Sequence, residues 1–106
     1  MKKYISIIIS IDKKENADII SDKLLKERLS PCIQKVKGVE SSYIWNNEIQ
    51  KDNELFLIIK TKVNNKKKIV DIIEKMHGYD TPEIISIDFD ILSKKYEEWF
   101  NDILGK

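Results

Sequence analysis

The chain is poor in the residues that mark several common protein classes. Its 106 residues include one cysteine, two prolines, three glycines, one histidine and one arginine. A lone cysteine, Cys32, excludes an intrachain disulfide framework and favours a reducing compartment, so we expect a cytoplasmic protein. Three scattered glycines do not make a glycine-rich phosphate-binding loop. Nothing in the composition demands an enzyme, and we expect none.

Charge of one sign is lacking as well, because 19 basic side chains offset 18 acidic ones. A net charge of +1 creates no strong field to attract nucleic acid or anionic lipid. Arg28 is the only arginine, the residue best suited to contacts with phosphate and guanine. The apolar stretch at 4–11 is too short for a membrane span and lacks the cleavage site of a signal peptide. We therefore expect no nucleic-acid partner and no membrane association.

What is present is a regular succession of strand and helix patterns. Apolar residues at every second position predict strands, and apolar residues at i, i+3, i+4 and i+7 predict helices. The predicted strands lie at 4–11, 32–45, 54–62 and 83–89, and the predicted helices at 17–29 and 66–76, with one more after Ser93. We interpret residues 1–106 as a single domain.

Punctuating residues set the expected boundaries of these elements. Asn16 is a candidate N-cap for the first helix, and Pro31 is expected to stop it. Gly38 predicts a bulge or a bend in a long strand, and Gly78 suits the position after the second helix. Turn-like residues at 46–47 and 51–53 are expected to separate the second strand from the third.

The order β-α-β-β-α-β predicts an α+β protein with a ferredoxin-like split β-α-β antiparallel sheet and an extra C-terminal helix. Both central helices would cover one face of the sheet and leave the other face partly bare. The last helix carries an aromatic stripe that includes Tyr96 and Trp99. Bare apolar surface of this kind predicts an oligomer.

The candidate site residues begin with His77, the only imidazole in the chain. It follows a helix and is close in sequence to Tyr79, Asp80 and Glu83, whose oxygen atoms are potential metal donors. His77 is therefore the predicted metal ligand, although the alternative of a solvated or carbonyl-capping histidine stays open. No second histidine or Cys-x-x-Cys spacing accompanies it.

Other candidates lie on the predicted hairpin. Tyr43 and Trp45 share one strand face and predict either contact between subunits or the wall of a ligand cleft. Glu54 and Lys60, six residues apart, would share a face of the facing strand and form an ion pair or bind a ligand. Cys32 is interpreted as a small packed side chain rather than as a nucleophile.

An ordered set of short motifs resembles the CutA, or divalent-cation tolerance, family over essentially the whole chain. These motifs are Pro31-Cys32-Ile33, Ser42-Tyr43-Ile44-Trp45, Glu54, Ile59-Lys60-Thr61, His77-Gly78-Tyr79-Asp80-Thr81-Pro82-Glu83-Ile84 and Tyr96-x-x-Trp99. The resemblance implies a ferredoxin-like homotrimer in which long hairpins cross to neighbouring subunits. It also implies architectural kinship with PII-type signalling proteins.

The resemblance further implies divalent-cation tolerance and copper binding, with departures in this chain. Bacterial members credited with copper binding carry a cysteine at the end of the first strand and a pair of histidines before a Pro-Tyr motif. Here Ser10 takes the place of that cysteine, Met76-His77 replaces the pair, and Gly78 replaces the proline. Of the implied ligands only His77 remains.

Two functions follow as expectations. The first is a trimeric divalent-cation tolerance protein that binds Cu²⁺, Zn²⁺ or another divalent metal through His77. The alternative is a PII-like small-molecule sensor or partner-binding module with an intersubunit cleft. The candidate cleft residues are Tyr43, Trp45, Lys60, His77, Tyr79 and Glu83. A minority hypothesis gives His77 the role of a general base beside Tyr79 and Glu83.

Overall fold

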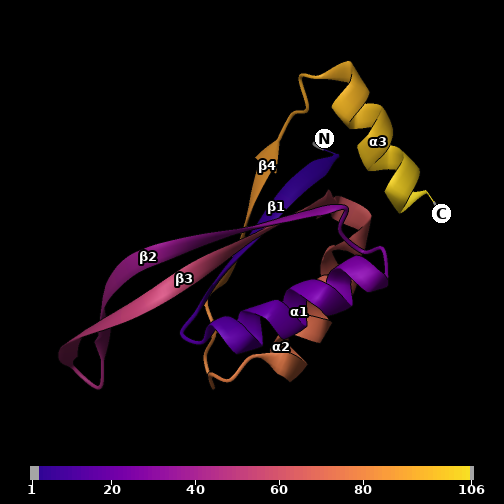
Figure 1. Cartoon of the computed structure of the whole chain (residues 1–106). Coiled ribbons are helices and arrows are strands. Elements are labelled where there is room, and N and C mark those ends of the chain that lie inside the picture. The colour runs from indigo at the N-terminus through magenta and orange to yellow at the C-terminus, as the bar shows by residue number, and fades with distance from the viewer. Residues whose placement is uncertain (1–2, 106) are drawn as a thin grey trace.

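The computed structural model describes residues 3–105, and within them four strands form one antiparallel sheet in the order β2-β3-β1-β4 (Figure 1). The succession of strands and helices is the predicted α+β arrangement with an extra C-terminal helix. The elements are β1 (Tyr4–Ile11), α1 (Lys14–Lys26), β2 (Cys32–Trp45), β3 (Glu48–Lys62), a 3-10 turn η1 (Val63–Asn65), α2 (Lys66–Met76), β4 (Ile84–Phe89) and α3 (Lys94–Leu104). No helix in residues 3–105 has the length and apolar character needed to cross a membrane.

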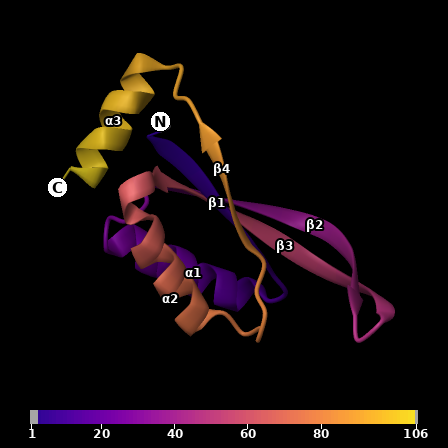
Figure 2. The same cartoon turned by 180° about the vertical axis from the view of Figure 1, so that it is seen from behind.

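The core lies between one face of the sheet and the two helices α1 and α2, which lie side by side on that face (Figures 1 and 2). Every second residue of β1 from Ile5 to Ile11 is at most 2% exposed, because strand side chains alternate between faces. Burial of one such isoleucine stabilises the fold by about 1.5–3 kcal/mol. The helices meet these residues with side chains that are fully buried, namely Ala17, Ile20, Leu24, Ile69 and Ile73.

Helix α1 is shifted toward the N-terminus relative to its predicted bounds of 17–29. Asn16 lies inside the helix, and the N-cap residue is Lys13, which gives no side-chain cap. The helix ends before Pro31 because Arg28 adopts a left-handed backbone with φ of 55°. The predictions that Asn16 caps the helix and that Pro31 stops it are therefore wrong.

The β2–β3 hairpin is longer than predicted, because β3 begins at Glu48 and not at residue 54. Asn46 and Asn47, with φ of 52° and 63°, make a two-residue turn of the kind that matches strand twist. The second predicted turn, at 51–53, is wrong, since those residues pair with residues 40–42 of β2. The bulge predicted at Gly38 is confirmed by a register shift between Val36 and Val39.

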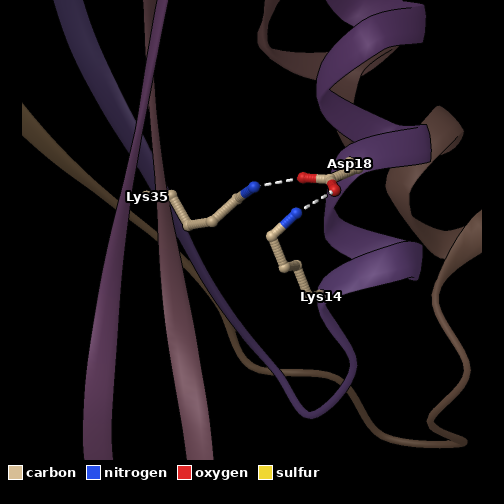
Figure 3. A network of polar contacts seen from close by, with 3 residues as sticks. All are labelled: Lys14, Asp18 and Lys35. Atoms are coloured by element: carbon tan, nitrogen blue, oxygen red, sulfur yellow. Dashed lines mark hydrogen bonds and ion pairs between the residues drawn. The ribbon is translucent and has the colours of Figure 1, made fainter.

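A polar network ties the hairpin to α1. Asp18 of α1 accepts hydrogen bonds from Lys14, one turn earlier in the helix, and from Lys35 of β2 (Figure 3). The Lys14 Nζ to Asp18 Oδ2 distance is 2.8 Å. These two ammonium groups lower the pKa of Asp18 to about 2. The hairpin is thus fixed to the helix layer next to its bulge.

The second face of the sheet is only partly covered, as predicted. Helix α3 lies over one end of it, where Phe100 is fully buried against Tyr4 and Phe89. Ser93 caps α3 by accepting a hydrogen bond from the Tyr96 backbone N–H. Directly opposed strand residues share a face, which leaves an apolar set that we call the open sheet face: Ile8, Val36, Phe56, Ile58, Ile85 and Ile87.

The far half of the hairpin extends beyond the sheet (Figures 1 and 2). Pairing of β1 with β3 ends at Ile11 and Leu55, so the distal strands pair only with each other. At the end of this arm, which we call the hairpin tip, Ile44, Trp45 and Ile49 are 74%, 50% and 76% exposed. Large apolar side chains on both an open face and a projecting arm are typical of surfaces that meet other subunits.

Candidate functional site

The candidate site is the segment between α2 and β4, and His77 is its most buried residue. His77 is the C-cap residue of α2, and its backbone N–H donates to the Ile73 carbonyl at 2.8 Å. The side chain is only 8% exposed. Gly78 follows the C-cap residue, the position expected for it, and its φ is not positive.

Both ring nitrogens of His77 are engaged by backbone groups. Nε2 lies 2.8 Å from the Ser10 carbonyl oxygen, and Nδ1 lies 3.2 Å from the Tyr79 backbone nitrogen. A carbonyl oxygen only accepts and a backbone N–H only donates. Nε2 therefore carries the proton and donates to Ser10, while the lone pair of Nδ1 accepts from Tyr79.

Tyr79 continues this chain of contacts to the hairpin. Its ring lies 4.6 Å from the His77 ring, centroid to centroid. Its hydroxyl donates a 2.6 Å hydrogen bond to Glu54 Oε2. Burial, followed by the bond to Glu54 and the negative charges of Asp12 and Asp52, raises the pKa of Tyr79 well above its usual value. The phenol is thus held neutral as a donor.

A divalent metal at this site would need free donor atoms around His77. A histidine ligand must offer a nitrogen lone pair, and the one on Nδ1 is taken by Tyr79. Within residues 3–105, no cluster of three or more His, Cys, Asp or Glu side chains has the arrangement needed to hold a metal ion. Asp80 and Glu83, the predicted helpers, are exposed. The residues of one protomer do not fit a resident metal, and His77 as a metal ligand stays a prediction.

The predicted cleft residues are spread along the protomer. Tyr43, opposite Gln50 in the far hairpin, is ten residues along β3 from Lys60, or roughly 33 Å at strand spacing. Trp45 lies at the hairpin tip, and exposed Glu83 precedes β4. Within the cleft set, His77 contacts Tyr79, and Tyr43 and Trp45 are neighbours on β2, but these two pairs lie apart. A cleft that combines them needs a second subunit and remains a prediction.

Glu54 and Cys32, two further candidates, each contact a tyrosine. Glu54 and Lys60 are both in β3, six residues apart, and the partner of Glu54 is Tyr79, which donates a hydrogen bond to it. Cys32 is half-buried and contacts Tyr96, and burial together with the bond to this thiol raises the pKa of Tyr96 to about 12. Cys32 pairs with Lys60, far along the sheet from the end of β1 that His77 contacts.

Sequence reasoning missed the two partners that define this site. Ser10 contributes a backbone carbonyl, and a backbone acceptor leaves no signal in the sequence. Glu54 was noted as a charge, but its bond to Tyr79 joins residues 25 positions apart in the chain. The motif that contains His77 and Tyr79 indicates the site in the sequence. Only the folded structure identifies Ser10 and Glu54 as their partners.

Known proteins share both the sequence pattern and the fold of this chain. The family described as CutA1 divalent ion tolerance protein matches residues 5–103. The divalent-cation tolerance protein CutA of Thermus thermophilus is 30% identical over 99 residues, which cover 93% of this chain and 96% of that protein. The crystal structure of the divalent ion tolerance protein CutA1 from Ehrlichia chaffeensis superposes with a TM-score of 0.88 at 32% identity, covering 98% of this chain and 97% of that one.

A plant relative limits which properties of the relatives can be assigned to this chain. The chloroplastic protein CutA of Arabidopsis thaliana is 31% identical over 98 residues, which cover 92% of this chain. The chain spans about half of that relative, 54% of its length. Relatives thus include a protein named for another compartment, and the cytoplasmic location of this chain stays a prediction.

Proposed function

The chain belongs to the CutA1 divalent ion tolerance protein family, and from this premise we propose that it works as a cytoplasmic, non-enzymatic homotrimer in the response to divalent cations. The observation that carries the assembly is the open sheet face. Val36, Ile85 and Ile87 are 42%, 47% and 55% exposed on it, beside half-buried Ile8 and Ile58. A contiguous apolar surface of this kind is stabilised when a second copy covers it.

The hairpin supplies the complementary element. Its tip projects beyond the sheet and exposes Ile44, Trp45 and Ile49, while its length lets it reach a neighbouring chain. A patch on one surface that fits a different patch on the next copy makes a head-to-tail contact, and such contacts form a ring when the rotation between copies closes. The number three follows from the resemblance to the family, and the exposed surfaces support self-association without setting the number of subunits.

The link to cations does not require a resident metal in the protomer. The donor set around His77 does not fit one, so no step is assigned to a bound ion. Copper or zinc binding at His77 is the specific form of this function predicted from the sequence. Titration calorimetry with Cu²⁺ and Zn²⁺ on wild type and His77→Ala tests it, and equal heats from both proteins would exclude His77 as a ligand.

The assembly is tested with two matched isoleucines. Ile87 on the open sheet face and Ile19 on α1 are both 55% exposed, but they lie on opposite sides of the sheet. We expect Ile87→Lys to place an ammonium group in the subunit interface and convert trimers to monomers in native mass spectrometry. Ile19→Lys should remain trimeric. Trimers in both variants would remove the open sheet face from the assembly.

The cellular role is tested with the same pair of variants. In a host that lacks its own family member, growth under raised Cu²⁺ is measured with each protein expressed. Wild type and Ile19→Lys should restore tolerance, and Ile87→Lys should not. Restoration by a monomeric Ile87→Lys would show that cation tolerance does not depend on the trimer.

A further inference from the structure

We propose that His77 is a positioning residue which fixes the segment between α2 and β4 to the end of β1, and that it is not a metal ligand within the protomer. This inference goes beyond the proposed function and does not depend on the trimer. It rests on which atoms occupy the two ring nitrogens and on the burial of the ring.

The imidazole spans two backbone groups from different parts of the chain. Nε2–H reaches the Ser10 carbonyl at 2.8 Å, across 67 residues of sequence. Nδ1 accepts from the N–H of Tyr79, two residues further along the chain, at 3.2 Å. One bond anchors the segment to β1, and the other bends the segment around the ring. At 8% exposure the ring is largely shielded from the competing water that weakens such bonds.

A metal ion would have to break part of this arrangement. Metal-bound histidines commonly donate their other N–H to a carbonyl, as Nε2 does to Ser10. The metal would then bind Nδ1, but that atom is occupied by the Tyr79 N–H. Removing that bond leaves a backbone donor without its partner, which is unfavourable where the donor stays buried. Among residues 3–105 no cluster of three or more His, Cys, Asp or Glu side chains is arranged to offset this cost by holding the ion.

The residue that His77 positions is Tyr79. The turn closed on Nδ1 packs the Tyr79 ring against the imidazole, 4.6 Å between centroids. From this position the phenol reaches Glu54 on β3 at 2.6 Å. His77 therefore connects the end of β1, the segment after α2 and the base of the hairpin.

Three substitutions separate the two bonds of His77. Asparagine places an acceptor oxygen where Nδ1 lies and closes the same turn on the N–H two residues on. Glutamine places an amide donor near the position of Nε2 but lacks that acceptor. Amide hydrogen exchange at Tyr79 is the readout. We expect exchange to rise roughly tenfold in His77→Ala and His77→Gln, the effect of one lost hydrogen bond, and to stay near wild type in His77→Asn.

Metal binding is measured on wild type and the same three variants, each titrated with Cu²⁺ and Zn²⁺ in a calorimeter. The proposal expects no binding that depends on His77. Binding of one ion per subunit in wild type that all three variants lose would overturn it, as would equal Tyr79 exchange in His77→Asn and His77→Ala. Native mass spectrometry of the same samples reports subunit number, so a failure of the trimer is distinguished from a failure of this inference.

Discussion

Tyr79 and Glu54 are joined by a 2.6 Å hydrogen bond at the point where the sheet gives way to the free hairpin. Pairing between β1 and β3 ends at Leu55, and Glu54 is the next residue outward. The segment after α2 thus supports the base of the projecting arm. Because the arm has no other strand beside it there, this contact helps to fix its direction.

Removal of the Tyr79 hydroxyl should destabilise the protein. A half-buried hydrogen bond to a carboxylate contributes about 1–2 kcal/mol, so we expect Tyr79→Phe to lower the free energy of unfolding by that amount. Urea denaturation monitored by circular dichroism measures it. Tyr43→Phe is the matched control, since Tyr43 donates to Asp52 on the exposed hairpin and should lose less. Equal losses would show that the Tyr79 bond has no special role.

The periodic elements of this fold could be predicted from the sequence, and the site contacts could not. The alternation from Ile5 to Ile11 fixes a half-buried strand, and the structure confirms its bounds. The start of β3 was missed because Gln50 and Asn53 are polar in a strand whose far half has no core to face. A strand shows alternating apolar residues in its sequence because one of its faces is buried. The far half of the hairpin is solvated, so its sequence lacks that alternation.

The contacts of His77 illustrate the other limit. The sequence shows that His77 follows a predicted helix and has oxygen-bearing neighbours, and from these features we predict a metal ligand. The partner on β1 is a carbonyl, which every residue carries, so no pattern could identify Ser10. The tautomer follows only from having both backbone groups in place. Sequence thus located the site, and the topology determined what its atoms contact.

The pH dependence of stability should carry the signature of Asp18. Its pKa is lowered to about 2 by Lys14 and Lys35, so the folded state favours the ionised carboxylate. Such a group stabilises the fold above its unfolded value of 3.8, and the contribution is lost as pH falls from there toward about 2. Asp18→Asn should therefore lower Tm at neutral pH and have little effect near pH 2.

A control for Asp18 comes from α2. Asp71 pairs with Lys67 at 3.3 Å within one helix, where the lysine side chain is 91% exposed. Such pairs contribute little, so Asp71→Asn should leave Tm nearly unchanged at both pH values. Scanning calorimetry across the acid range compares the two variants. A loss for Asp18→Asn that persists undiminished at the acid end would rule out the ionised carboxylate as its cause.

Alkaline titration should show that the tyrosines ionise at higher pH in the folded protein than in the unfolded chain. Burial is the largest cause that raises the pKa of Tyr4, Tyr79 and Tyr96, the last to about 12, and the bond to Asp52 raises that of Tyr43. The folded state thus favours neutral phenols. Their contribution to stability is complete below about pH 10 and falls as pH rises above it, because the unfolded chain ionises first.

Phenolate absorbance against pH measures this directly. The folded protein should titrate at higher pH than the same protein in denaturant. Tyr96→Phe should remove one of the late-titrating groups and leave the rest. Coincident curves for folded and unfolded protein would contradict the burial of these rings.

Gly38 should be the glycine whose replacement costs most. Its φ of 76° lies in the left-handed region, where a β-carbon costs about 1–2 kcal/mol. A β-carbon there would meet no atom within 4 Å, so no new packing offsets the strain. We expect Gly38→Ala to lower the free energy of unfolding by about 1 kcal/mol. Urea denaturation at fixed protein concentration measures this, since an oligomer gains stability with concentration.

Gly78 provides the matched control for the backbone argument. It does not adopt a positive φ, and a β-carbon there would lie 3.7 Å from the Asn16 side chain, an ordinary contact. Alanine restricts the unfolded chain more than glycine does, so Gly78→Ala should be neutral or stabilising by up to about 1 kcal/mol. The two variants then differ in sign although the residue change is identical. If Gly78→Ala cost as much as Gly38→Ala, the left-handed backbone at the bulge would not be the source of the loss, and the bend of the hairpin would need another cause.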